Sequence, residues 1–353
     1  MPSSARAPAS PAHGYVPLVE VRRGGTVESV HFGAIAVVDA GGRAIASVGD
    51  PATSVVLRST AKPVQVLPLL DSEAAERFGF SEEEIAVMIG SHGGEPFHVG
   101  AVRSILKKTG LDETALQCGA HAPNHKPSAR ELRRLGREPS ALHNNCSGKH
   151  AGMLALAVHL GAPVTAYLDP AHPVQALIRS RLEALAGLGP GAMGTGIDGC
   201  SAPTFVMPLG SLALLYARLA AGAGDAGTPD AAARRAVAAM RCHPEMIAGT
   251  DRLCTDLIRK GRGGLIAKIG AEGMYGLACE RDGRSIGIAL KIADGEGQRA
   301  RFSAALEALL QLGALSAGDA AALRERYVGD VRNHRGLKVG TIATTFALAR
   351  GML

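Results

Sequence analysis

The strongest constraint on the fold of this 353-residue chain is that strand-like sequence stands at both ends and helix-like sequence lies between them. Alternating apolar segments over residues 15–56 predict an antiparallel meander. Strand patterns return in "GGLIAKIG" and in a hairpin over residues 275–292, which turns at Asp282 and Gly283. Strands from both ends must share one sheet, so the sequence predicts an α/β fold whose antiparallel sheet is built from both ends of the chain around an inserted helical lobe.

Helical periodicity dominates the middle of the chain. Ser81 and Glu84 form a capping box ahead of "EEEIAVMIG", which predicts that a helix begins there. Further helices are expected near residues 97–109, 128–136, 148–160, 173–187, 210–221, 229–241, 251–260 and 295–312. We therefore expect a single catalytic domain over residues 15–353, with a sheet lobe at about 15–57 and 262–353, a helical lobe at about 58–261, and a disordered tail over residues 1–14.

Composition and charge exclude several classes of protein. The net charge is +6, but the basic residues are scattered among 32 acidic ones and only 3% of residues are aromatic, which argues against nucleic-acid binding. No apolar run is long enough for a membrane span, and the first thirteen residues lack the apolar core of a signal peptide. Six cysteines without a CxxC pair favour neither a disulfide framework nor a four-ligand structural zinc site. We expect a soluble, cytoplasmic protein that acts on a small molecule.

The stretch "LRSTAKPVQ" places Ser59 three residues before Lys62, at the point where an apolar strand gives way to a helix. Positions i and i+3 share a helix face, so the lysine could accept the seryl proton, and the helix start could stabilise an oxyanion. An ordinary helix N-terminus explains the same letters equally well. Ser104 and Lys107 have the same spacing, but they lie inside an amphipathic helix and indicate only a solvated face.

Penicillin-recognising enzymes combine a Ser-x-x-Lys nucleophile with a second serine motif and a late Lys-Thr-Gly strand. The "KTG" at 108–110 indicates a helix C-terminus and follows Ser59 too soon. Lys268 stands in an apolar strand followed by a hairpin and a helix, whereas Lys338 has only a short segment after it. Ser91 opens a Gly-rich loop directly after a helix, where a ligand could approach the backbone. The predicted catalytic residues are Ser59, Lys62, Ser91 and Lys268.

Two further Gly-bearing segments concentrate polar side chains. "HNNCSGKHAGM" contains Cys146 and Lys149, and "GIDGCSAPTF" contains Asp198 and Cys200. Two thiolates with a third donor could bind zinc, Lys149 could instead lower the pKa of Cys146, or both cysteines could be small buried apolar residues. His121 in "CGAHAPNH" is expected to anchor a loop and not to bind a metal.

Taken together, seven segments resemble the asparaginase II family, the thermolabile serine-lysine asparaginases also called class 3. They are "RSTAKPVQ", "SHGGEPFHVGAV", "CGAHAP", "HNNCSGKHAGM", "GIDGCSAPTF", "KIGAEG" and "KIADGEGQRA". The similarity extends from about Val19 to the C-terminus. It implies an L-asparaginase that forms L-aspartate and ammonia, a fold like that of serine β-lactamases and glutaminases, and a homodimer.

The resemblance also implies roles for particular residues. Ser59 would be the nucleophile with Lys62, and Ser91 with Lys268 would form a second Ser-Lys pair. The implied zinc ligands are Cys146, Lys149 and Cys200, with the metal organising the substrate site. From their chemistry we expect Arg58 to bind the substrate α-carboxylate and Asp198 its α-ammonium group or a metal-bound water.

Two other kinds of function stay open on the sequence. One is a different serine acyl-transfer hydrolase, such as a glutaminase, an esterase or a β-lactam-binding enzyme. The other is a zinc-binding protein without catalytic activity. Turnover of an ester or β-lactam but not of asparagine would favour the first, and zinc uptake without turnover of any small amide would favour the second.

Overall fold

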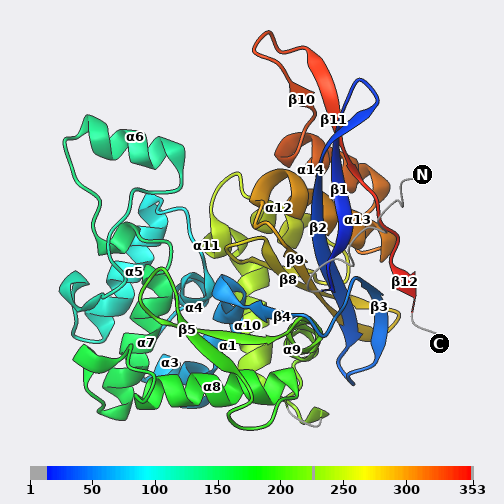
Figure 1. The fold of residues 1–353 in the computed structure, drawn as a ribbon. Coiled ribbons are helices and arrows are strands. Elements are labelled where there is room, and N and C mark those ends of the chain that lie inside the picture. The colour runs from blue at the N-terminus through cyan, green and yellow to red at the C-terminus, as the bar shows by residue number, and fades with distance from the viewer. Residues whose placement is uncertain (1–13, 225–226, 351–353) are drawn as a thin grey trace, which may run out of the picture.

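The computed structural model describes residues 14–224 and 227–350, so the expected tail lies outside the described residues except for Gly14. A large antiparallel sheet dominates one side of the molecule (Figure 1). Its strands are β1 (Val16–Arg23), β2 (Thr26–Asp39), β3 (Ala44–Val48), β7 (Ile266–Ile269), β8 (Met274–Arg281), β9 (Arg284–Ile292), β10 (Val331–Arg332), β11 (Lys338–Thr344) and β12 (Ala349–Arg350). Strands β1 and β2, from the N-terminal end, lie between strands from the C-terminal end, which confirms the predicted sheet.

The strand order explains how the two ends of the chain meet. The order is β10-β11-β1-β2-β9-β8-β7, with β3 paired to β2 and β12 paired to β3. The central contact joins β2 to β9 antiparallel, from Gly33 opposite Ile292 to Asp39 opposite Ile286. Asp282 and Gly283 have φ angles of 50° and 70° in the turn between β8 and β9, as the sequence predicted for this hairpin.

The helices between the two groups of strands are mostly short. They are α1 (Lys62–Gln65), α2 (Leu67–Asp71), α3 (Ala74–Phe78), α4 (Glu82–Ile89), α5 (Pro96–Lys108), α6 (Lys126–Arg134), α7 (Ser147–Leu160), α8 (Pro173–Ala186), α9 (Leu209–Ala221), α10 (Ala231–Cys242), α11 (Pro244–Ala248) and α12 (Leu253–Lys260). The capping box of Ser81 and Glu84 is present at the start of α4. Two more helices, α13 (Phe302–Gln311) and α14 (Ala317–Tyr327), follow β9, and the sequence analysis predicted only the first.

Helix α9 joins the helical part of the chain to the sheet. It packs on β2, β8 and β9 (Figure 1). Its backbone comes so close to β9 that a Cβ at Gly287 would lie 1.9 Å from the Ala213 carbonyl oxygen. Only glycine fits at that point of β9. This close contact fixes the distance between the sheet and the segment that precedes Ser59.

A second, three-stranded sheet was not expected. It consists of β4 (Ser54–Val56), β6 (Pro203–Pro208) and β5 (Gly194–Ile197), in that order. The sequence analysis treated residues 194–205 as a Gly-rich loop, but most of them form two strands joined by a tight turn at 198–202. Pairing of β4 with β6 places the segment before Ser59 beside the segment that carries Asp198 and Cys200. The division into two lobes stays a prediction.

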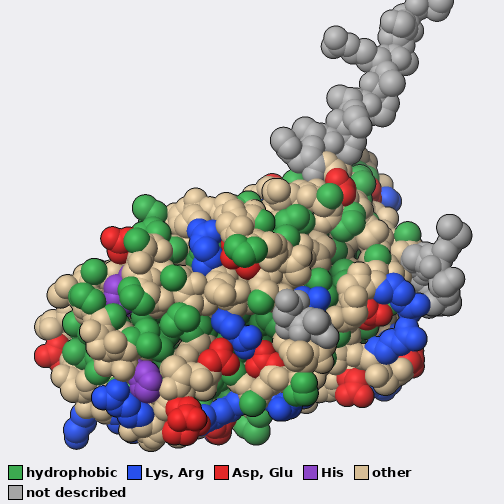
Figure 2. Space-filling model, turned by 90° about the horizontal axis from the view of Figure 1, so that it is seen from below, with side chains coloured by type: hydrophobic (Ala, Val, Ile, Leu, Met, Phe, Trp, Pro, Cys, Tyr) green, Lys and Arg blue, Asp and Glu red, His purple; other side chains and the backbone are tan. Residues whose placement is uncertain are grey.

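Two sequence-based exclusions can be compared with the described part of the chain. In it, no helix has both the length and the apolar character needed to cross a bilayer. Figure 2 shows Lys and Arg side chains interspersed with Asp and Glu on the face seen from below, and no continuous basic stripe is visible there. The absence of nucleic-acid binding stays a prediction.

Candidate functional site

The Ser59 segment follows a strained residue. The Leu57 amide donates to the Phe205 carbonyl at 2.9 Å, which ties the end of β4 to β6. Arg58 then has a φ of 51°, a left-handed conformation that costs a non-glycine residue free energy. A 3-10 turn over Arg58–Ala61 leads directly into α1. Ser59 is therefore presented at a sharp strand-to-helix junction, as the sequence predicted.

The Lys62 side chain bonds to two neighbouring loops. It is 1% exposed. Its Nζ donates to the Gly90 carbonyl at 2.6 Å, to the Ser91 hydroxyl at 3.0 Å and to the Asn145 carbonyl at 3.1 Å. Ser59 and Lys62 are linked through the backbone, where the Lys62 amide donates to the Ser59 carbonyl. Among the described residues, no hydrogen bond joins the Ser59 hydroxyl to either lysine.

The second Ser-Lys pair is in direct contact. Lys268, on β7, is fully buried, and its Nζ lies 2.7 Å from Ser91 Oγ and 3.0 Å from the Ile269 carbonyl oxygen. The Ser91 amide donates to the Ile247 carbonyl at 2.9 Å, which holds the serine loop in place. The structure thus brings Ser91, Lys62 and Lys268 together, while the Ser59 hydroxyl, among the described residues, bonds to neither amine.

Electrostatics favour one uncharged lysine at this junction. Burial lowers the pKa of Lys268 well below its usual value, and the positive Lys62 lowers it further. Burial also lowers the pKa of Lys62, although the Cys146 thiolate opposes this effect. In the described part of the chain, the Ser91 hydroxyl bonds only to the two amines, so its own proton needs a neutral amine as acceptor. Lys268 fits that role, because Lys62 already donates to three acceptors.

Both serines open into one cleft of about 420 Å³. Arg58 and Asp198 also line it, and the Arg58 Nε donates to Asp198 Oδ1 at 2.8 Å. Burial raises the pKa of the Asp198 carboxyl, but Lys149 and Arg58 outweigh that effect and hold this pKa below its usual value. A guanidinium and a carboxylate side by side present the two charges that complement the carboxylate and ammonium groups of an amino acid.

The three predicted zinc ligands also converge. Cys146, Lys149 and Cys200 are each no more than 6% exposed, and Lys149 Nζ lies 3.0 Å from Cys200 Sγ. A hydrogen bond with Cys200 lowers the pKa of Cys146 well below that of a free thiol, and the same bond raises the pKa of Cys200. These opposite directions favour ionisation of Cys146 before Cys200. Burial lowers the pKa of Lys149, but both thiols raise it above the usual value.

The donor chemistry of this cluster fits zinc. Thiolates are preferred zinc ligands, and both cysteines line the cleft, which leaves a side of the cluster open to a further ligand. Among the described residues there is no group of three or more His, Cys, Asp or Glu side chains suited to a metal, so the third donor would have to be the Lys149 amine after it loses its proton. Zinc binding stays a prediction.

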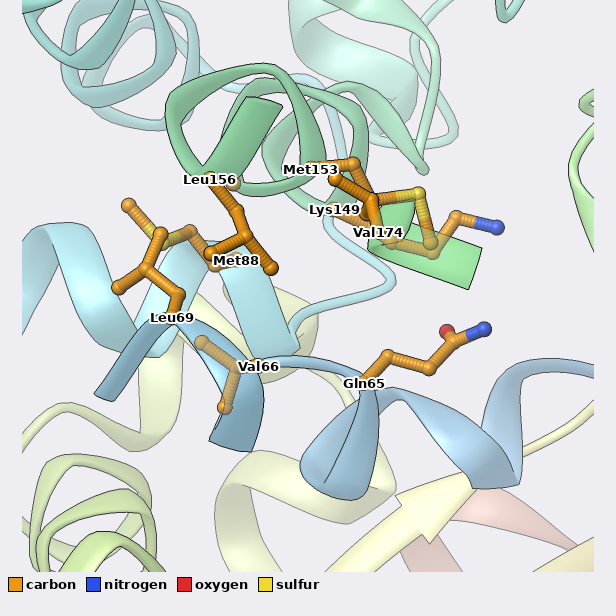
Figure 3. A pocket seen from close by; sticks show the side chains of 9 residues that line it. Gln65, Val66, Leu69, Met88, Lys149, Met153, Leu156 and Val174 are labelled. Atoms are coloured by element: carbon orange, nitrogen blue, oxygen red, sulfur yellow. The ribbon is translucent and has the colours of Figure 1, made fainter. Parts of the chain in front are cut away.

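Apolar packing behind the cluster fixes Lys149. A closed cavity of only about 10 Å³ lies there, and Figure 3 shows the Lys149 side chain among Met88, Met153, Leu156 and Val174. The cavity is too small for a substrate. It indicates that the lysine stem is packed in an apolar wall while its amine reaches the Cys200 sulfur.

Sequence analysis missed a tyrosine that supports the Ser59 turn. Tyr216, on α9, is fully buried, and its hydroxyl donates to the Thr60 carbonyl at 2.8 Å. Its ring lies against Gly276, where a Cβ would approach the ring to 2.2 Å. Gly276 is opposite Lys268 in the β7–β8 register. A glycine inside the "MYGLACER" strand was the one signal of such a close approach.

An arginine of the cleft was also missed. Arg301 lies at the end of a π-helical turn over Gly297–Arg301, which the Glu296 side chain caps by accepting from three successive backbone amides. Its Nη1 donates to the Gly270 carbonyl at 2.6 Å, and the residue is 8% exposed. His121, in contrast, acts as expected: its Nε2 accepts from the Asn145 amide at 3.0 Å and anchors that loop.

The chain matches the model of one protein family, described as L-asparaginase II, over residues 19–344. No match was found among curated proteins. Solved structures that it resembles include the protein Mglu in its native form, with 17% identity over 83% of this chain and a TM-score of 0.42. Another is the Bacillus subtilis glutaminase YbgJ in covalent complex with 5-oxo-L-norleucine, with 14% identity over 74% of this chain and 80% of that chain and a TM-score of 0.34. The match spans 62% of the length of Mglu.

Proposed function

The chain belongs to the L-asparaginase II family, a family of amidohydrolases, and we propose that it hydrolyses the side-chain amide of L-asparagine to L-aspartate and ammonia. One observation carries the proposal. A serine hydroxyl held between two buried lysine amines opens into the same cleft as an Arg–Asp pair that matches the charges of an amino acid. The cleft thus combines groups for acyl transfer with groups for amino-acid recognition.

Substrate binding in this proposal replaces an ion pair within the protein. Arg58 contacts Asp198 at 2.8 Å, and an α-amino acid would insert its carboxylate against the guanidinium and its ammonium group against the carboxylate. Each protein charge would exchange one charged partner for another, so neither would be left unpaired in a partly buried site. The substrate amide would then extend toward the two serines.

Ser59 is the proposed nucleophile. Its oxygen would form a bond to the side-chain carbonyl carbon, while its proton passes through the Ser91 hydroxyl to the uncharged Lys268. Burial lowers the pKa of Lys62 as well, so direct transfer to Lys62 is the alternative when Lys62 is the uncharged amine of the two. The same proton would be returned to the departing nitrogen when the C–N bond breaks, which releases ammonia. Water would then cleave the aspartyl ester and restore the Ser59 hydroxyl. The missing contact between Ser59 and Lys62 is no objection, because catalytic hydrogen bonds often form only when substrate binds.

Ser91 is better suited to proton transfer than to attack. It is 8% exposed and touches both amines, so it can accept a proton from one side and donate to the other. Ser59 is the more accessible of the two and stands at the start of a helix, where backbone N–H groups can stabilise an oxyanion. These differences support the assignment of attack to Ser59 and proton transfer to Ser91.

Cys146, Lys149 and Cys200 would hold a zinc ion in this proposal. When bound, the ion would supply a fixed positive charge beside Asp198 that helps to orient the substrate. Removal of zinc by a chelator should therefore raise KM more than it lowers kcat. Equal loss of activity in a Cys146→Ala variant and in the chelated wild type would support a shared role for metal and ligand. A chelated enzyme with unchanged KM would contradict it.

Assembly and location rest on the family resemblance and the sequence. We propose a homodimer in the cytoplasm. Light scattering on the purified chain would measure the mass directly, and a monomer at micromolar concentration would contradict the dimer.

The function is tested by ammonia release from L-asparagine, with L-glutamine, a chromogenic ester and a β-lactam as competing substrates. The variants are Ser59→Ala and, as a matched control, Ser104→Ala, which alters the other Ser-x-x-Lys motif on α5. We expect turnover of L-asparagine that Ser59→Ala abolishes and Ser104→Ala preserves. Ester or β-lactam hydrolysis without asparagine turnover would refute the proposal. Glutamine is a close competitor, since one methylene is worth only about 1–3 kcal/mol of discrimination.

A further inference from the structure

A second cleft of about 490 Å³ adjoins the active-site cleft. The two clefts share four residues, Arg252, Ile269, Gly297 and Arg301. The other lining residues come from the loop after Ser91, the start of α6, the segment from the end of α11 to the start of α12, and Gln298, Phe302 and Tyr327. Its volume lies within the usual range for sites that bind small molecules. The proposed hydrolysis makes no use of it.

Three cations in this second cleft have spare binding capacity. In the described part of the chain, the side chains of Arg252 and Lys126 have no hydrogen-bond or ion-pair partner, and both line the cleft. Arg301 is 8% exposed, and its Nη1 donates to the Gly270 carbonyl, but its buried Nε has no partner. Nη1 also lies 3.5 Å from the Met274 carbonyl oxygen, whereas among the described residues Nη2 has no hydrogen-bond partner and is the group a ligand in the cleft could contact. An arginine this buried and incompletely paired is costly unless a ligand or water completes its contacts.

The acidic residues of the second cleft are already engaged. Glu95 Oε1 accepts from the Thr250 amide at 2.8 Å, and Glu95 Oε2 lies 3.7 Å from His125 Nδ1. Asp251 forms an ion pair with Arg326. The lining thus carries three cations, Arg252, Arg301 and Lys126, against the two acids Glu95 and Asp251, and Asp251 is already paired with Arg326 outside the lining. The cleft therefore attracts an anion.

The backbone adds to this preference. Helix α12 begins at Leu253, and its N-cap residue, Arg252, provides no side-chain acceptor for the first-turn amides. Helix α6 begins at Lys126, which also lines this cleft, but its N-terminus adds little because His125 accepts from the Ser128 amide and Pro127 has no N–H. Helix N-termini carry a partial positive charge and free N–H groups that bind carboxylate or phosphate.

We propose that this second cleft binds a small dicarboxylate and that the ligand slows turnover in the neighbouring active site through the shared Arg252 and Arg301. The preference for an anion follows from the cations and the helix start alone. The choice of a dicarboxylate rests on the proposed function, because hydrolysis of asparagine turns a neutral amino acid into one with a second carboxylate next to this cleft. The site would then respond to accumulating product.

Calorimetric titration of the full-length protein with succinate tests the site without any need for catalysis. Inorganic phosphate serves as the second ligand. The informative variant is Lys126→Glu, because Lys126 lines only the second cleft, and Lys107→Glu on the exposed side of α5 is the matched charge control. We expect succinate to bind, Lys126→Glu to weaken it by about fivefold, as loss of one exposed charge contact permits, and Lys107→Glu to leave it unchanged.

Inhibition kinetics complete the test. Succinate should lower kcat for L-asparagine in the wild type, and Lys126→Glu should relieve this effect while basal activity stays the same. The proposal is overturned by purely competitive inhibition, by equal weakening in both Lys→Glu variants, by no heat of binding, or by phosphate binding more tightly than succinate. If succinate binds as expected but no amide is hydrolysed, the second site stands and the proposed function fails.

Discussion

Ser91 and Ser59 line one cleft in opposite surroundings. Ser91 is 8% exposed, lies on a loop fixed by the Ile247 carbonyl, and contacts Lys268 at 2.7 Å and Lys62 at 3.0 Å. Ser59 is more exposed, follows the strained Arg58 and reaches neither amine. Spacing in sequence therefore does not decide which groups share a proton. The Ser-x-x-Lys motif supplies Lys62, but the fold turns that lysine toward Ser91.

The largest effect should come from removing the nucleophile. Ser59→Ala should lower kcat for L-asparagine by about 10³-fold or more, because an acyl-enzyme cannot form without it. Ser91→Ala should cost about 10²–10³-fold, in the range for a proton-transfer group. Initial rates of ammonia release with both variants measure the difference, and circular dichroism checks that each is folded. If Ser91→Ala were much the more damaging, the roles of the two serines would have to be exchanged.

If Arg58, in the Ser59 turn, binds the substrate, its removal should raise KM. Arg58→Ala removes the guanidinium that pairs with Asp198 at 2.8 Å, so KM should rise by about 10–100-fold, as expected for a hydrogen bond to a charged group. The value of kcat should change by much less. Arg179→Ala, at a surface arginine outside the cleft, is the control. An unaltered KM in Arg58→Ala would remove this residue from substrate binding.

Loss of the hydrogen bond that Tyr216 donates to the Ser59 turn should change kcat by a smaller factor. Tyr216→Phe deletes the hydroxyl that donates to the Thr60 carbonyl and leaves that buried oxygen unpaired, at a cost of about 1–3 kcal/mol. We expect kcat to fall by about threefold to tenfold with KM nearly constant. Tyr275→Phe is a matched control, because Tyr275 is equally buried but bonds Cys254. Equal effects of the two substitutions on kcat would mean that Tyr216 acts only on stability.

Lys268, which contacts Ser91, should make the free energy of unfolding depend on pH. Burial and Lys62 lower the pKa of Lys268 in the folded state, whereas the unfolded chain keeps a pKa of about 10.4. Between those two values the unfolded state binds more protons, so stability rises with pH across this window. Lys268→Met should reduce the rise. Urea unfolding at several pH values measures the slope, and an unchanged slope in the variant would show that Lys268 is not the depressed group.

Much of this fold follows from sequence pattern, because regular elements are set locally. Strand alternation, the Ser81 capping box and the turn at Asp282 each depend on a few adjacent residues, and the structure has all three. The small sheet of β4, β5 and β6 escaped prediction, since the four-residue strand "GTGI" has little strand propensity and forms only through pairing with β6.

For a similar reason, the sequence predicted the residues of the candidate site but not all of their contacts. Motif letters identified the residues that the cleft brings together, including Cys146, Lys149 and Cys200. The partner of each lysine depends on contacts between segments distant in sequence, such as Lys268 with Ser91. Tyr216 and Arg301 were invisible for the same reason, because their roles arise only from packing on β8 and on the end of β7.

The most direct test of the account is to identify the residue that becomes covalently modified. The diazoketone analogue of L-asparagine would be incubated with the wild type, Ser59→Ala and Ser104→Ala, followed by intact-mass measurement and peptide mapping. The account predicts one label on Ser59, absent from Ser59→Ala and retained in Ser104→Ala. A label on Ser91 in the wild type, or undiminished labelling of Ser59→Ala, would contradict it.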